Sequence, residues 1–193
     1  MRLILATTYA IFFLAVSCRD NSGTAPLFCI NTSEFLPLQT GNYWKVDDKN
    51  YLEVIGNKRF NGTEYAQCLR YLDYLNAPDT SYYRVDKSGV LIGYFQSVNK
   101  EEGMTKFCTY QGERFNLRED LSVDVFSITT VKATTDTLVF EYNVPRACIG
   151  LGPCPNSVYR NTYVRNIGWT DAGAVGLRGK LTEIRIGSRI YRL

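Results

Sequence analysis

The chain has one long apolar run near its start, and after it only short runs in which apolar and polar residues alternate. The long run extends from Leu3 to Leu14, follows the charged residue Arg2 and ends in Ala15-Val16-Ser17. A positive start, a short apolar run and a small-residue cleavage site are the parts of a secretory signal peptide. The run is too short to cross a bilayer, which requires roughly twenty residues. We therefore expect residues 1–17 to be a cleaved signal peptide.

The segment Leu14-Ala15-Val16-Ser17-Cys18 is followed by an abrupt change to polar composition. It resembles the lipobox of bacterial lipoproteins, in which the cysteine becomes the acylated N-terminus. The resemblance implies a lipidated Cys18 and a membrane partner, because two or more acyl chains anchor stably where one does not. In that family, a residue other than Asp after the cysteine, here Arg19, favours the outer membrane. The expected location is the cell envelope, on the outer membrane facing the periplasm or the cell surface.

After a polar tether over residues 18–34, the alternation takes the period of two that is typical of half-buried strands. Asn61-Gly62 separates two β-rich runs, and this dipeptide is preferred in two-residue hairpin turns. Pairing Phe60 with Thr63 would place Ile55 opposite Cys68. Further strands are expected at 81–86, 90–98, 104–110, 115–117, 121–131, 138–144, 158–169, 180–186 and 189–193, with a charged turn at 99–103.

No helical period follows the signal peptide, and turn signals recur every eight to twelve residues or so. The predicted fold class is all-β. About ten strands would form an antiparallel meander curled into a sheet, barrel or sandwich, as a single domain over residues 35–193.

Two segments of this domain, residues 35–44 and 163–169, are similar to segments of uncharacterised bacterial lipoproteins. The first reads Phe-Leu-Pro-Leu-Gln-Thr-Gly-Asn-Tyr-Trp, with Tyr43 and Trp44 on opposite faces of a strand. The second is a partial match, because Asn166 and Trp169 replace a Gly and a Leu of the family pattern. Trp44 is expected to be a core anchor rather than a ligand-stacking residue. These families have no agreed activity, so the resemblance implies little about function.

Composition excludes several kinds of chemistry. The net charge of +3 is too small to indicate a nucleic-acid partner, and the chain has no histidine. A Ser-His-Asp triad and the HExxH zinc motif are therefore excluded. Paired acids occur at residues 47–48, 101–102 and 119–120, where we expect solvated turn charges, and the glycine-rich segment at 173–179 is read as a plain loop. No catalytic residue, cofactor or metal site is predicted.

Five cysteines remain after Cys18, at positions 29, 68, 108, 148 and 154. An exported chain meets an oxidising compartment, so disulfides are the default, although an odd number leaves at least one thiol over. We expect a local disulfide between Cys148 and Cys154 and a second one between Cys68 and Cys108.

Aromatic side chains on sheets either pack or form binding platforms. The candidate binding face consists of Tyr71, Tyr82, Tyr94 and Trp169, with a glycan, a lipid or an envelope protein as the expected partner. The sequence favours a non-catalytic, lipid-anchored envelope protein that serves as a ligand-binding, partner-binding or assembly module. The alternatives are a carboxylate-dependent glycan hydrolase, which needs two acids in one pocket, and a lipid carrier with an apolar half-barrel cavity.

Overall fold

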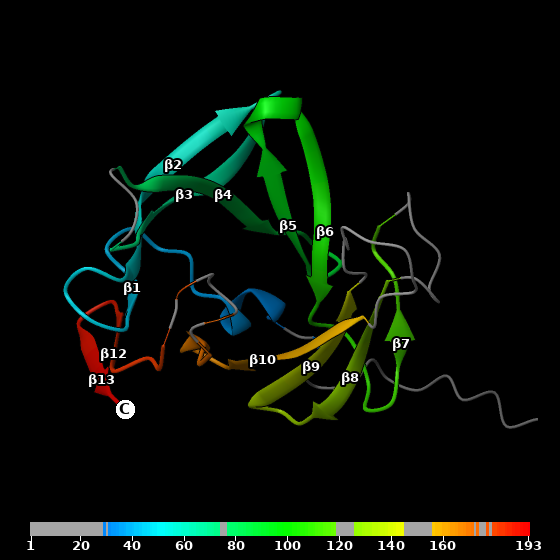
Figure 1. Ribbon diagram of the computed structural model, residues 1–193. Helices are drawn as coiled ribbons and strands as arrows, with labels where there is room; N and C mark the ends of the chain where they lie inside the picture. The colour runs from blue at the N-terminus through cyan, green and yellow to red at the C-terminus, as the bar shows by residue number, and fades with distance from the viewer. Residues whose placement is uncertain are drawn as a thin grey trace, which may run out of the picture.

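The structure, a computed structural model, describes residues 29, 31–73, 77–118, 126–144, 156–171, 173, 177 and 179–193. Regular structure in these ranges is almost entirely strand, and the helices are short 3-10 turns such as η2 (Thr32–Phe35) and η3 (Gln96–Val98). This confirms the predicted all-β fold (Figure 1). Within the described ranges, no helix is long and apolar enough to span a membrane. The predicted signal peptide and Cys18 lie outside them.

Two antiparallel sheets make up the described part of the fold. The larger sheet has the order β13-β12-β1-β2-β3-β4-β5-β6, and the smaller has the order β11-β10-β9-β8-β7. The strands of the larger sheet are β1 (Tyr43–Lys45), β2 (Tyr51–Phe60), β3 (Thr63–Tyr71), β4 (Asp79–Val85), β5 (Val90–Phe95), β6 (Lys100–Lys106), β12 (Glu183–Ile186) and β13 (Arg189–Arg192). The strands of the smaller sheet are β7 (Arg114–Phe115), β8 (Ser127–Ala133), β9 (Thr137–Val144), β10 (Ser157–Val164) and β11 (Gly168–Trp169).

Hairpin turns follow the sequence signals closely, but one strand register does not. Phe60 pairs with Thr63 as predicted, and Asn61 and Gly62 both have positive φ. The predicted pairing of Ile55 with Cys68 is wrong, because a β-bulge places Val54 opposite Cys68. The bulge takes Ile55 out of the ladder, and its side chain is 40% exposed.

Two other boundaries also differ from the prediction. The expected charged turn at 99–103 is the first half of β6, which begins at Lys100 just after η3. The expected strand at 158–169 is divided into β10 and β11, because the chain turns where Asn166 has a φ of +61°. Asparagine tolerates this left-handed conformation better than most residues, which suits Asn166 to this turn.

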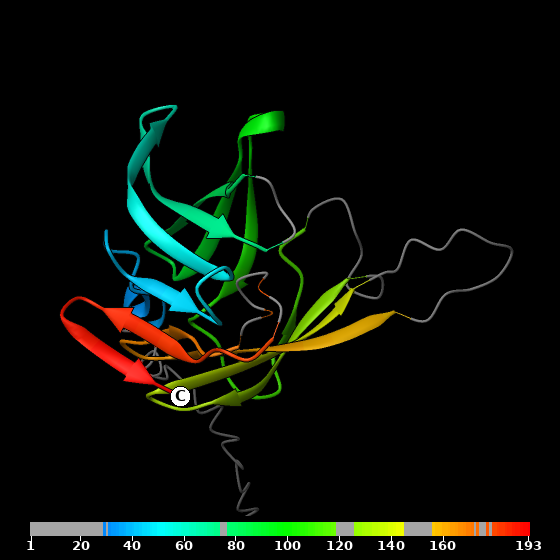
Figure 2. The ribbon, with the colours of Figure 1, turned by 60° about the vertical axis from the view of Figure 1, so that its left-hand side comes forward.

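The larger sheet arches over the molecule, and the smaller sheet lies beneath it (Figures 1 and 2). Between the sheets is the main core, whose largest fully buried side chains include Phe35 of η2, Trp44 of β1, Phe107 after β6 and Phe140 of β9. Phe35 stacks on Phe107 at 5.8 Å between ring centroids. The short helix η2 thus joins the core of both sheets. Trp44 is fully buried, which confirms it as a core anchor.

Residues 35–44 and 163–169 meet in this core. The indole nitrogen of Trp44 donates to the carbonyl of Ile167 at 3.1 Å, and its ring packs edge-on against Trp169 at 5.1 Å. Asn42 is also buried, donates to the carbonyl of Pro37 and accepts from the amide of Gly187. Asn42, Trp44 and Trp169 of these segments are therefore used for packing.

A second, smaller aromatic cluster lies on the opposite face of the larger sheet. Phe60 of the β2–β3 hairpin stacks on Tyr94 of β5 at 4.2 Å, and Tyr65 and Tyr82 pack around the pair. These rings come together because the β2–β3 hairpin folds back over β4 and β5. The larger sheet therefore has a buried cluster on each face, and the two clusters lie at different positions along the strands.

The predicted disulfide between Cys68 and Cys108 is wrong. Cys108 is bonded to Cys29, 79 residues earlier in the chain, and Cys68 is a free thiol buried in the main core. The packing of η2 on Phe107 brings Cys29 next to Cys108, whereas Cys68 points inward from the middle of β3. Burial raises the pKa of the Cys68 thiol to about 12, which makes it a poor nucleophile. Cys148 and Cys154 lie outside the described residues.

Candidate functional site

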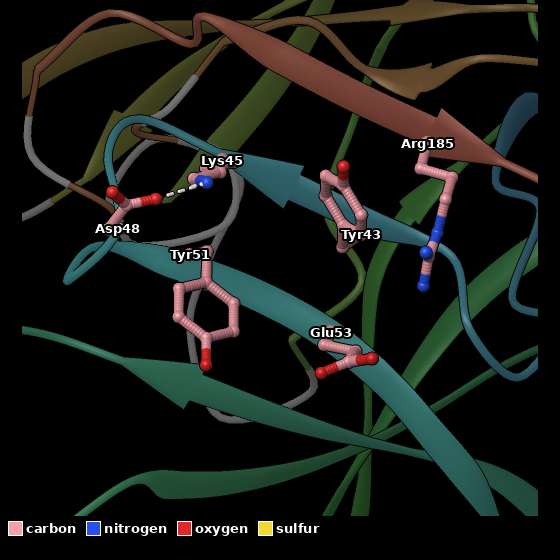
Figure 3. A pocket seen from close by; sticks show the side chains of 6 residues that line it. All are labelled: Tyr43, Lys45, Asp48, Tyr51, Glu53 and Arg185. Atoms are coloured by element: carbon pink, nitrogen blue, oxygen red, sulfur yellow. Dashed lines mark ion pairs between the residues drawn. The ribbon is translucent and has the colours of Figure 1, made fainter. Parts of the chain in front are cut away.

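The outer surface of β12, β1 and β2 carries a polar depression (Figure 3). Successive side chains of a strand point to opposite faces, so burial of Trp44 turns both of its neighbours outward. Tyr43 pairs across the ladder with Glu53 on one side and Arg185 on the other. Cross-strand partners share a face, so these side chains surround one site. The depression has a volume of about 300 Å³ and is lined by Tyr43, Lys45, Asp48, Tyr51, Glu53 and Arg185.

Ion pairs and hydrogen bonds fix the polar groups of this depression. The guanidinium of Arg185 lies 4.6 Å from the centre of the Tyr43 ring, and its Nε donates to the carbonyl of Gly41 at 2.9 Å. The hydroxyl of Tyr43 donates to the carboxylate of Glu183. This hydrogen bond and partial burial raise the pKa of Tyr43 above its ordinary value. Lys45 pairs with Asp48 at 2.5 Å.

A stacked tyrosine pair borders the depression. Tyr51 of β2 lies parallel to Tyr71 of β3, with 4.4 Å between ring centroids and 17° between ring planes. A neighbouring depression of about 520 Å³ shares Asp48 and Tyr51 with the first and also contacts Tyr71. We call the surface formed by Tyr43, Tyr51 and Tyr71, with Lys45, Asp48, Glu53 and Arg185 between and around them, the outer tyrosine face.

The predicted binding face does not form as a unit. Tyr71 belongs to the outer tyrosine face, but Tyr82 and Tyr94 are buried in the small aromatic cluster. Trp169 is on the smaller sheet and is only 2% exposed in the main core. Alternation does place Tyr71, Tyr82 and Tyr94 on one side of the sheet, but the folded-back hairpin covers the last two.

Sequence reasoning missed most of the outer tyrosine face. Arg185 reaches it only because β12 pairs with β1, about 140 residues earlier in the chain. No local pattern signals such a pairing. The available signals were Tyr71, which was part of the predicted binding face, and the outward orientation of Tyr43, which follows from burial of Trp44.

One member of each acidic pair in the described part of the chain, Asp47 and Glu101, has a structural role. Asp47 closes its turn by accepting from the backbone amides of Lys49 and Asn50, and hydrogen bonds from Asn50 and Lys49 lower its pKa. Glu101 lies on β6, where hydrogen bonds from Tyr65 and Arg84 lower its pKa against the effect of burial. A general acid needs a raised pKa, so these two groups do not support a hydrolase. The pair at 119–120 is outside the described residues.

Metal ligands do not gather in the described ranges, where no group of three or more Cys, Asp or Glu side chains is placed to hold an ion. Comparison with known proteins gives no relatives: no family model matches the chain, and neither a curated protein nor a solved structure matches it.

Proposed function

We propose that this chain is a non-catalytic, lipid-anchored protein of the bacterial cell envelope that binds a glycan through its outer tyrosine face. The observation that carries the proposal is the arrangement of Tyr43, Tyr51 and Tyr71 on three adjacent strands of an open sheet surface. Glycans present apolar C–H faces to aromatic rings and hydroxyl groups to the polar side chains beside them.

The charges of the face suit an uncharged, hydroxyl-rich ligand. Lys45 and Arg185 offer donors, while Asp48 and Glu53 offer acceptors, so neither sign dominates. An anionic polymer would favour a uniformly basic surface, and an acyl chain would favour an enclosed apolar one. The main core is filled by aromatic side chains such as Trp44, Phe35 and Phe140, which gives no support to a lipid carrier.

The anchor is tested by labelling cells with radiolabelled palmitate. We expect label on the wild-type protein and none on the Cys18→Ala variant, which should also lose its association with membranes. An unlabelled wild-type protein, or label that persists in the variant, would refute the lipid anchor and leave the binding face to be judged separately.

Glycan binding is tested by co-sedimentation with insoluble peptidoglycan and by a panel of envelope polysaccharides. The mature chain carrying Cys18→Ser is suitable, because it has no acyl chain and needs no detergent. Stacking on one aromatic ring contributes about 0.5–1.5 kcal/mol, so Tyr51→Ala and Tyr71→Ala should each weaken binding by roughly threefold to tenfold.

Tyr110→Ala is the matched control, because Tyr110 is exposed and is not part of the outer tyrosine face. It should bind like the wild type. Failure of the wild-type chain to bind any glycan, or equal losses in all three variants, would contradict the proposal.

A further inference from the structure

A wedge-shaped cleft opens where the two sheets diverge, on the opposite face of the larger sheet from the outer tyrosine face. Exposure rises along the inward side of β5 from Leu91, at 1%, to Phe95, at 43%. It rises in the same way along β10 from Tyr163, at 2%, to Tyr159, at 46%. Both strands therefore run from the main core toward the surface. The ends of β9 and β10 extend past β5 and β6 (Figure 2).

The cleft has a volume of about 270 Å³, and its lining is mostly aromatic and apolar, with Glu102 and Arg118 as its charged residues. Tyr142 and Tyr159 form one wall, stacked with 2° between their ring planes, and Phe95 and Met104 form part of the other. A second depression of about 450 Å³ shares Phe95 and Met104 with it. Small-molecule sites usually have roughly 300–1,000 Å³, so the cleft suits a compound of one or two rings.

One polar atom in this cleft lacks a partner. Asn161 is only 6% exposed and lines the cleft between Tyr163 and Tyr159 on the inward side of β10. Its amide group contacts the hydroxyl of Tyr142, but its side-chain oxygen is buried and accepts no hydrogen bond from the described part of the chain. Leaving a buried acceptor unsatisfied is unfavourable, so a ligand that donates a hydrogen bond here would be favoured over one that does not.

We propose that this cleft is a second binding site, for a small aromatic ring compound that carries an N–H or O–H donor. The rings of Tyr159 and Phe95 contact the body of the ligand, and Asn161 accepts its hydrogen bond. The site is distinct from the outer tyrosine face and does not depend on the function proposed for it.

Indole and indene provide the test, because they have nearly the same shape and only indole has an N–H group. Both are titrated into the mature Cys18→Ser chain, with calorimetry as the measurement. We expect indole to bind roughly tenfold more tightly than indene, because one hydrogen bond to a buried acceptor contributes about that factor in affinity. Asn161→Leu replaces the amide by an apolar group of similar size, and it should remove this preference.

Phe95→Ala is the second variant, at an exposed position where misfolding is not expected. It should weaken both compounds by about threefold to tenfold and leave their ratio unchanged. Tyr51→Ala, on the outer tyrosine face, should bind indole like the wild type. The proposal is overturned if neither compound binds, if the preference persists in Asn161→Leu, or if Phe95→Ala changes nothing.

An aromatic donor could be a free small molecule or the side chain of a peptide. N-acetyl-tryptophanamide, which adds peptide groups to the indole ring, separates these sources in the same titration. Tighter binding than indole identifies a peptide side chain, and weaker binding identifies a free compound.

Discussion

Trp44 shows how single residues hold distant parts of this chain together. Its ring fills the space next to Gly168, whose φ of +85° is in the left-handed region. A Cβ at Gly168 would lie 2.8 Å from the Trp44 ring and 3.2 Å from Pro37. Glycine is thus required here both for the backbone turn between β10 and β11 and for the close approach of the indole.

Gly168→Ala is expected to lower the free energy of unfolding by about 2 kcal/mol or more, because it combines backbone strain with overpacking of the core. Urea denaturation followed by tryptophan fluorescence measures this change. Gly56→Ala is the matched control, since nothing lies within 4 Å of its added Cβ and its φ is not positive. It should be neutral or stabilising by up to about 1 kcal/mol. Equal effects of the two substitutions would contradict this account of Gly168.

At the scale of elements, β2 contributes to two separate clusters. Before the bulge at Ile55, Leu52 and Val54 point into the main core, and beyond it Phe60 packs with Tyr94 on the other face.

The connection between β6 and β7 is stabilised by an ion pair and hydrogen bonds. Glu113 accepts hydrogen bonds from Lys106 and Thr109, and Thr109 shares a further bond with Thr130 of β8. Burial acts to raise the pKa of Glu113, but these bonds outweigh it and the pKa is lowered.

Acid should therefore weaken this connection. A carboxyl group with a lowered pKa stabilises the fold above its unfolded value, near 4.5, and this stability is lost as the pH falls through the folded value. Glu113→Gln should reduce the loss of stability between about pH 5 and pH 3, as measured by urea denaturation across that range. Glu64→Gln, at an exposed carboxylate, should leave the pH profile close to that of the wild type. An unchanged profile in Glu113→Gln would show that its ion pair is not maintained in solution.

Local signals predicted most of the elements, whereas contacts between distant segments were not predictable. Asn61-Gly62 and Gly89 specify their turns through backbone conformation alone, so both hairpins were found. The bulge at Ile55 follows from packing on two faces, which alternation does not encode. The outer tyrosine face depends on the pairing of β1 with β12, and the cleft depends on how far the two sheets diverge. Both are properties of the folded chain as a whole.

The whole molecule is held together by one long-range covalent link in its described part, the disulfide between Cys29 and Cys108. Such a link stabilises mainly by restricting the unfolded chain, and more so for longer loops. It closes a loop that contains strands β1 to β6 of the larger sheet. The smaller sheet lies outside this loop and relies on packing against the main core.

Cys29→Ser is expected to lower the free energy of unfolding by about 2–4 kcal/mol, because it removes this restriction. Urea denaturation without reductant measures the loss. The double variant Cys29→Ser/Cys108→Ser should be about as stable as the single one, since each breaks the same bond. A wild-type peptide map that joins Cys68 to Cys108 would contradict the pairing.

The same disulfide determines how tension from a membrane anchor would be transmitted to the domain. If Cys18 carries the acyl chains, it lies only eleven residues before Cys29. This segment spans at most about 40 Å when fully extended. Tension along this segment would reach the domain at Cys29 and divide between η2 and, through the sulfur bridge, Cys108 just after β6. The short helix that seats Phe35 beneath the arch would then share this tension with the chain next to Phe107, the ring on which Phe35 stacks.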